Sequence, residues 1–141
     1  MEKISLISGI DSENYVEVAE ETMKSLKGKG LTTSKIRNIL ALISQVYNDV
    51  VLENEELSGE ASNRIKYLKV RVVYEYGREE ANSKREMERN GVDAHPLQLF
   101  IKSGKIIECV DAIGRSKRKF ILFNKYVEAL VAYHKYFGGN D

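Results

Sequence analysis

An apolar stripe with helical spacing, between Ile36 and Val50, constrains the fold more than any other feature of the sequence. Its members recur at intervals of three and four residues: Ile36, Ile39, Leu40, Ile43, Val46, Tyr47 and Val50. A helix with such a stripe has to bury it against other elements. A single proline in 141 residues argues against an all-β fold, which needs a turn about every 8 to 12 residues. The sequence therefore predicts an all-α protein.

Further helices are expected around this one. We predict them at about Ser12–Leu26, at about Ala61–Gly77 with a weaker continuation through Arg78–Asn90, from Pro96 with a bend or end near Ser103, and at about Ser116–Phe137. The last of these carries two neighbouring apolar stripes, which indicates contacts with several neighbours. The expected fold is a single compact bundle of about five helices, forming one helical domain over residues 1–141, with a flexible loop near residues 79–93.

Candidate catalytic and metal-binding residues are few. One cysteine, Cys109, excludes an internal disulfide, and with only two histidines it cannot complete an ordinary four-ligand zinc site. Phosphate-loop, dinucleotide-binding and paired-carboxylate motifs are absent from the sequence. Cys109 lies in the apolar run Ile106–Val110, which favours an inert buried thiol over a nucleophile. We expect no catalysis, no cofactor and no metal, and a hydrolase that uses Cys109 and His134 is the remaining enzymatic alternative.

The uncharged stretches of the chain are short. The run Ile4–Ile10 is too short for a secretory signal, and the longest uncharged stretch, Asn38–Asn48, has eleven residues. A membrane-spanning helix needs about 20 mostly apolar residues. A cytoplasmic protein without a membrane partner is expected.

The two parts of the chain carry opposite charge. Residues 1–60 have a net charge of −5 and residues 61–141 a net charge of +6. This asymmetry has two interpretations: a polyanion site on one face, or an acidic face of one copy that meets a basic face of the next.

Three arginines form a line on the helix predicted after Ala61. Arg64, Arg71 and Arg78 are seven residues apart, so on a helix they lie nearly in line about 10.5 Å apart, flanked by Tyr67 and Tyr74. Guanidinium groups at this spacing suit a nucleic-acid backbone, because arginine binds phosphate in a bidentate manner and tyrosine can stack on unpaired bases. The alternative is a solvated helix edge whose arginines pair with glutamates nearby in the sequence.

A second basic cluster stands where the last helix should begin: Arg115, Lys117, Arg118 and Lys119. Cations are unfavourable at a helix N-terminus by about 0.3 to 1 kcal/mol each. An anionic partner would relieve this cost, and a solvated loop is the alternative.

Three segments, taken together and in this order, resemble a known family. They are Leu31–Arg37, Lys66–Arg78, and Phe120–Phe123 with Tyr126–Lys135. The set is similar to the small subunit of the type III-A CRISPR effector, the Csm complex.

This resemblance implies an all-helical, non-catalytic subunit. Several copies are expected to stack as a minor filament and to contact the target RNA paired to the guide crRNA, together with other Csm subunits. Such contacts would be independent of sequence, because the guide reads the sequence. The matching segments contribute the candidate RNA contacts Lys35, Arg37, Lys69, Arg71 and Arg78, and the pattern argument adds Arg64 and Lys119. The alternative is a purely structural scaffold whose basic face docks an acidic protein surface, such as the Glu53–Glu60 segment of another copy.

Overall fold

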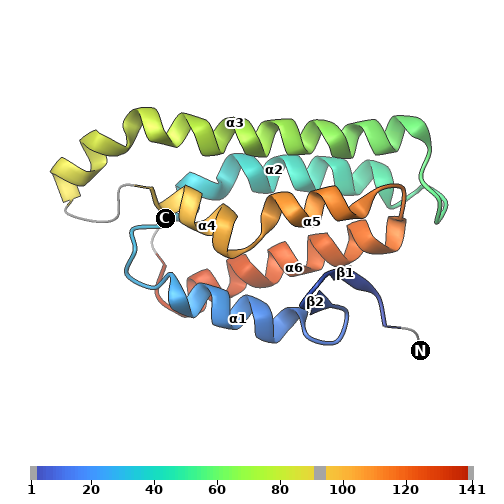
Figure 1. The fold of residues 1–141 in the computed structure, drawn as a ribbon, viewed down its shortest axis with the longest axis horizontal. Coiled ribbons are helices and arrows are strands. Elements are labelled where there is room, and N and C mark those ends of the chain that lie inside the picture. Colours follow the sequence, from blue (N-terminus) through green and yellow to red (C-terminus); the bar gives the residue numbers. More distant parts are fainter. Residues whose placement is uncertain (1–2, 91–94, 140–141) are drawn as a thin grey trace.

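The computed structural model describes residues 3–90 and 95–139, and only the backbone of residues 80–90. In this part of the chain, six helices and one antiparallel hairpin form a compact bundle (Figure 1). The strands are β1 (Ser5–Ile7) and β2 (Ile10–Asp11), and the helices are α1 (Tyr15–Ser25), α2 (Thr33–Val50), α3 (Gly59–Asn90), α4 (Pro96–Ser103), α5 (Ile106–Ile113) and α6 (Lys117–Tyr136). None of these helices, among the described residues, could span a membrane. The predicted all-α fold class is confirmed.

Helix α6 lies at the centre of the bundle and contacts α1, α2, α5 and strand β1 (Figure 1). Its two apolar stripes account for this position, because they place buried side chains on more than one side of the helix. The buried residues of α6 are Phe120, Leu122, Phe123, Tyr126, Val127, Leu130 and His134. The prediction that the last helix contacts several neighbours is confirmed.

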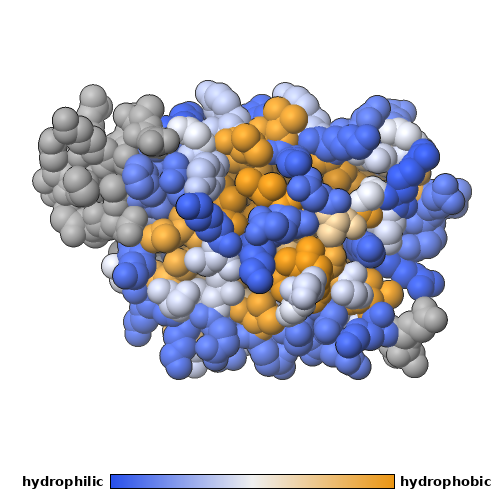
Figure 2. Space-filling model, viewed as in Figure 1, coloured by the Kyte–Doolittle hydropathy of each residue, from blue (hydrophilic) through white to orange (hydrophobic). Residues whose placement is uncertain are grey.

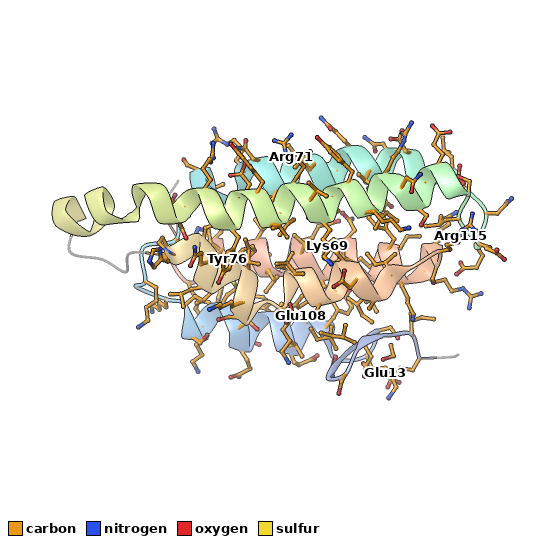
Figure 3. All side chains as sticks on the ribbon, turned by 45° about the horizontal axis from the view of Figure 1, so that its top comes forward. Glu13, Lys69, Arg71, Tyr76, Glu108 and Arg115 are labelled. Atoms are coloured by element: carbon orange, nitrogen blue, oxygen red, sulfur yellow. The ribbon has the colours of Figure 1, made fainter. Side chains whose placement is uncertain are left out.

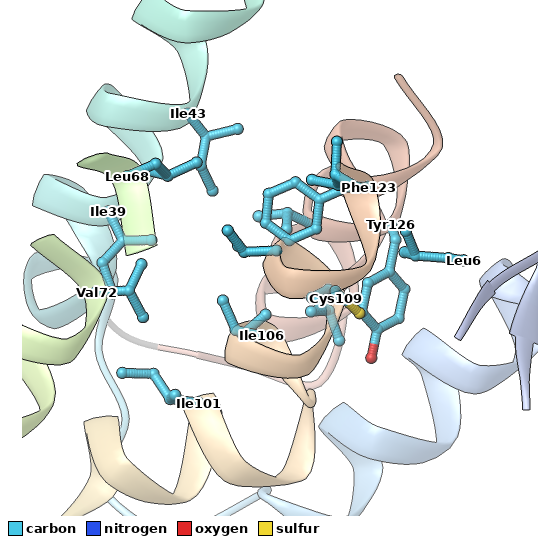
Figure 4. Packing of buried hydrophobic residues seen from close by; sticks show 14 of the residues in the cluster. Leu6, Ile39, Ile43, Leu68, Val72, Ile101, Ile106, Cys109, Phe123 and Tyr126 are labelled. Carbon is cyan, nitrogen blue, oxygen red and sulfur yellow. The ribbon is translucent and has the colours of Figure 1, made fainter. Parts of the chain in front are cut away.

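The stripe of α2 is buried as its spacing predicts. Ile36, Ile39, Ile43 and Val50 are almost inaccessible to solvent. In Figure 4, Ile39 and Ile43 lie beside Leu68 and Val72 of α3. Helix α3 also packs on α4 and α5, so it lies on one side of the bundle while α1 lies on the opposite side (Figure 1).

Helix α3 includes the segment Arg78–Asn90, for which the sequence left both a weak helical continuation and a loop open. We expected a flexible loop near residues 79–93, but the helix continues to Asn90, and residues 91–94 lie outside the described part of the chain. Residues 79–90 contain no glycine or proline and consist largely of Glu, Arg, Lys, Ala and Met. These residue types have high helix propensity, so charge density alone was a poor indicator of a loop.

The N-terminal hairpin was not predicted. It turns at Gly9, whose positive φ of 90° favours glycine, and it buries Leu6 and Ile10 against the helices. Ser12 closes the hairpin through its contacts with Ile4 instead of capping α1. Helix α1 therefore begins at Tyr15, three residues later than expected.

Candidate nucleic-acid interface

The arginine row, defined as Arg64, Arg71 and Arg78, lies on the side of α3 that faces α2. Arg64 fixes this orientation, because it pairs with Asp49 of α2 and with Glu60 one turn earlier on α3. These two carboxylates raise the pKa of Arg64, chiefly through the hydrogen bond with Asp49. The heptad spacing keeps Arg71 and Arg78 on nearly the same side.

Arg78 is only partly neutralised within the chain. Its Nη2 atom lies 2.8 Å from Oε2 of Glu75, whose side chain is buried, and its guanidinium carbon lies 6.0 Å from the centre of the Tyr74 ring. The Arg78 side chain remains half exposed. Its outer N–H donors can therefore still reach an anion.

Arg71, in the middle of the row, differs from its neighbours. Its Nε atom is buried, and in the part of the chain that the structure describes it has no hydrogen-bond partner. No carboxylate of the described residues forms an ion pair with this guanidinium. An unsatisfied buried donor is costly, and within the described ranges no acidic partner offsets the charge of this half-buried side chain.

Lys35 joins the row from α2. It is half-buried and lies seven and fourteen residues before Leu42 and Asp49, which line the α3 side of α2. Helix α2 runs alongside α3 in the opposite direction, so Lys35 lies toward the Arg78 end of the row. The antiparallel register therefore places Lys35 on the Arg78 side of the row, with Arg64 at the far end.

The other three candidates lie elsewhere. Arg37 is exposed and shares the side of α2 that carries Ser44 and Asn48, which line a depression between α2 and α6. Lys69 leaves α3 on the opposite side from Arg71 and pairs with Asp111 of α5 at 2.7 Å (Figure 3). Lys119 belongs to the N-terminus of α6. The seven candidate RNA contacts therefore do not form one continuous surface.

The basic cluster at the start of α6 has an anionic partner within the chain. Glu55, from the connection between α2 and α3, lies 3.3 Å from the backbone nitrogen of Arg118 and 3.5 Å from its Nε. Lys117 donates from Nζ to the carbonyl oxygen of Glu53, and Arg115 donates from Nε to that of Leu57. Ser116 caps the helix by accepting from the Lys119 nitrogen. These cations join two connections of the fold, while Arg115 and Arg118 remain exposed to solvent.

Complementary charge in the sequence was the signal for this joint. The acidic run that starts at Glu53 and the basic run that starts at Arg115 are about 60 residues apart in the sequence. Their pairing could not be predicted from the sequence, because only the packing of α3 against α5 brings the α2–α3 connection close to the α5–α6 connection.

Cys109 is fully buried, as expected (Figure 4). Burial, the largest cause, together with the neighbouring charge of Glu108 raises the pKa of its thiol to about 12. The thiolate needed by a nucleophile is thus scarce at neutral pH. The hydrolase alternative loses its nucleophile.

The start of α4 differs from the expected arrangement. His95 occupies the N-cap position, but its side chain does not cap the helix. The carboxylate of Glu79 on α3 caps it instead, accepting from the backbone nitrogens of Leu97 and Gln98 at 2.8 Å each. Glu79, which is 8% exposed, thus holds the start of α4 against α3.

The fold and this surface define a small helical protein with a basic, phosphate-compatible side on α3. A family model described as Csm2 Type III-A matches residues 10–140. The chain belongs to this family, Csm2 of type III-A, and the resemblance found in the sequence is confirmed.

Individual relatives agree with the family match, and each is described as "CRISPR system Cms protein Csm2". The protein of Mycobacterium tuberculosis H37Rv is 31% identical over 133 residues, covering 92% of this chain and 95% of that protein. The protein of Streptococcus thermophilus is 34% identical over 137 residues, covering 94% and 98%. The protein of Enterococcus italicus is 36% identical over 115 residues, covering 79% and 71%.

Proposed function

We propose that this protein is the non-catalytic small subunit of a type III-A CRISPR Csm complex in the cytoplasm. Several copies stack along the complex and contact the target RNA paired to the guide crRNA. Family membership supports the place in the complex. The arginine row supports the contact with RNA.

Arg71 is the observation that carries the RNA contact. It lies between two paired arginines, and among the described residues its own guanidinium has no carboxylate partner. The row has a spacing of about 10.5 Å, a little under two phosphate steps of a strand. Contacts of this kind bind the backbone and leave the reading of sequence to the guide.

The scaffold alternative has to compete with ion pairs inside the chain. It used the Glu53–Glu60 segment as the acidic surface of another copy. In this structure Glu55 contacts Arg118 and Glu60 contacts Arg64 of the same chain. Both carboxylates are more than half exposed, so a second copy that binds them would have to displace these surface pairs.

The test is the salt dependence of RNA binding by the purified Csm complex that carries Arg71→Ala. We expect weaker binding on all target sequences alike, with the slope of log K against log salt reduced by about 0.7 for the lost phosphate contact. Arg71→Lys keeps the charge but loses the bidentate geometry, so it should keep the slope and lose part of the affinity.

Lys125→Ala is the matched control, because it removes an exposed cation from α6 on another part of the surface. It should leave both affinity and slope unchanged. Equal RNA affinity and equal slope for wild type and Arg71→Ala would refute the RNA contact.

A further inference from the structure

The outward side of α3 carries an exposed apolar ridge, defined as Tyr67, Val70, Val73 and Tyr74. Each of the four side chains is about half exposed. They make up four of the seven large apolar side chains that are exposed in the described part of the chain. Figure 2 shows apolar surface along α3 at the top of the molecule. Scattered exposed apolar residues are ordinary, but a contiguous group on one helix indicates an interaction surface.

The ridge borders the arginine row: Tyr67 and Tyr74 flank the arginines, and the guanidinium carbon of Arg78 lies 6.0 Å from the centre of the Tyr74 ring. Successive residues of a helix differ by about 100° in direction, so Val70 points away from the side that carries Arg71. Tyr67, Val70, Tyr74 and Gly77 alternate steps of three and four, the spacing of a seam that packs against another helix. Gly77 has open space where a side chain would stand, so a partner helix can approach closely there.

The surroundings of the ridge are basic. Lys66 and Arg78 are exposed, and Arg71 is half-buried beside them. Between Ile65 and Arg78 the only carboxylate is Glu75, which is 3% exposed and paired with Arg78. A partner with acidic groups around an apolar contact therefore fits this side of α3.

Such a surface lies on the opposite side of the same molecule, on α1. Glu13, Glu17 and Glu21 are exposed there, and Glu20 is partly exposed. In their midst Val16 is another of the seven exposed apolar side chains, at 39%. Lys24, in the last turn, is the only lysine or arginine of α1, so this side of the helix is acidic on balance. Figure 2 shows a mostly hydrophilic lower edge, where Figure 1 places α1.

From this complementarity we infer that the ridge of one copy docks on the outer side of α1 of the next copy. The inference rests on the proposed stacking of copies and names the two surfaces that meet. Because the surfaces lie on opposite sides of the molecule, each contact leaves both outer surfaces free for another copy. Repetition gives an open, head-to-tail filament.

Docking of ridge on ridge is disfavoured by charge. It would place Lys66, Arg71 and Arg78 of two copies against one another, and like charges at an interface cost binding free energy. The same argument holds for α1 against α1, where four glutamates would meet.

Site-specific cross-linking of the assembled Csm complex tests the inference. A chain with both Val16→Cys and Val70→Cys is assembled and treated with a short bismaleimide. We expect a ladder of covalently linked copies on a denaturing gel. Both positions are exposed, so the substitutions should be tolerated, and the native Cys109 is fully buried and should not react.

The single variants are the matched controls. Val70→Cys alone and Val16→Cys alone should give no cross-linked dimer. A dimer from Val70→Cys alone would show ridge-on-ridge docking, and one from Val16→Cys alone would show α1-on-α1 docking. Either result overturns the inference, as does the absence of a ladder from the double variant in an intact complex.

A charge exchange gives a second readout. Glu17→Lys alone and Lys66→Glu alone should each weaken the ladder, and the two changes in one chain should restore it in part. The effect of Arg71→Ala on the affinity and salt slope of RNA binding separates this inference from the proposed function. A ladder without that effect supports the docking and contradicts the RNA contact, whereas that effect without a ladder supports the contact and overturns the docking.

Discussion

The carboxylate of Glu55 lies at the N-terminus of α6, 3.3 Å from the backbone nitrogen of Arg118. It supplies the negative charge that this helix N-terminus requires, although the charged residues in the first turn of α6 itself are all cations. The acidic connection between α2 and α3 is thereby joined to the basic connection between α5 and α6. Three of the four cations in the second basic cluster, Arg115, Lys117 and Arg118, take part in this joint.

Removal of this carboxylate should destabilise the fold modestly. For Glu55→Gln we expect the free energy of unfolding to fall by about 1 kcal/mol, because the helix loses an anion at its N-terminus while the pair with Arg118 is half exposed. Urea unfolding followed by circular dichroism measures the change. Glu56→Gln is the neighbouring control, and an equal loss for both variants would contradict the role of Glu55.

Loss of Glu79 should have a larger effect. Its carboxylate is 8% exposed and accepts two backbone N–H groups of α4. We expect Glu79→Ala to lower the free energy of unfolding by about 2 kcal/mol, since one buried and one part-buried N–H donor are left without an acceptor. Hydrogen exchange should show faster exchange at Leu97 and Gln98 in particular. Unchanged protection of these two amides would show that α4 is held by other contacts.

Cys109 should be unreactive in the folded protein and should make stability depend on alkaline pH. Burial raises the pKa of its thiol from the ordinary 9.0 to about 12. The unfolded chain therefore loses this proton at a lower pH than the folded chain, so the free energy of unfolding falls as pH rises above 9 toward 12.

This contribution is isolated by comparison with Cys109→Ala. Wild type should lose up to about 1.4 kcal/mol per pH unit more than the variant in this window. A thiol reagent at a pH of about 8, below the ordinary pKa of a free thiol, should modify the wild-type chain only after a denaturant is added. Rapid modification of the folded chain would contradict the burial of the thiol.

Gly77→Ala should stabilise the isolated chain. Gly77 lies in the interior of α3, and an added Cβ would meet open space. Alanine in place of a helix-interior glycine should raise the free energy of unfolding by about 0.5 to 1 kcal/mol. The thermal midpoint measures this gain, with Gly138→Ala as a contrast, because its φ of 88° makes alanine unfavourable there. If Gly77→Ala also weakens the ladder of the doubly substituted Val16→Cys, Val70→Cys chain, close approach at Gly77 is part of the docking.

The helices with a periodic apolar pattern were predictable, because the side of each helix that is buried is marked by its own apolar residues. The stripes of α2 and α6 are repeated every three or four residues, and the structure buries Ile39 and Phe123 as this repeat requires. The burial of Cys109 followed from its apolar neighbours in the same way. The hairpin was missed because its strands have only three and two residues, too few for a pattern.

The candidate site was predictable only in part. The heptad of Arg64, Arg71 and Arg78 sets their common side, and this comes from the sequence alone. The sequence alone does not show which of these arginines are neutralised, because Asp49, which pairs with Arg64, belongs to another helix. From the sequence, Lys69 is as good a candidate phosphate contact as the arginines. In the structure it forms an ion pair with Asp111 of α5.

Helix type, apolar faces and the line of three arginines were thus determined by the sequence, since each depends on residues within a few turns of one another. The tertiary structure decided which charges are occupied, because an ion pair needs two side chains that different helices bring together. It also decided that the ridge of α3 and the acidic side of α1 lie on opposite sides of the bundle. That placement follows from the packing of α6 between α1 and α2, which no local pattern contains.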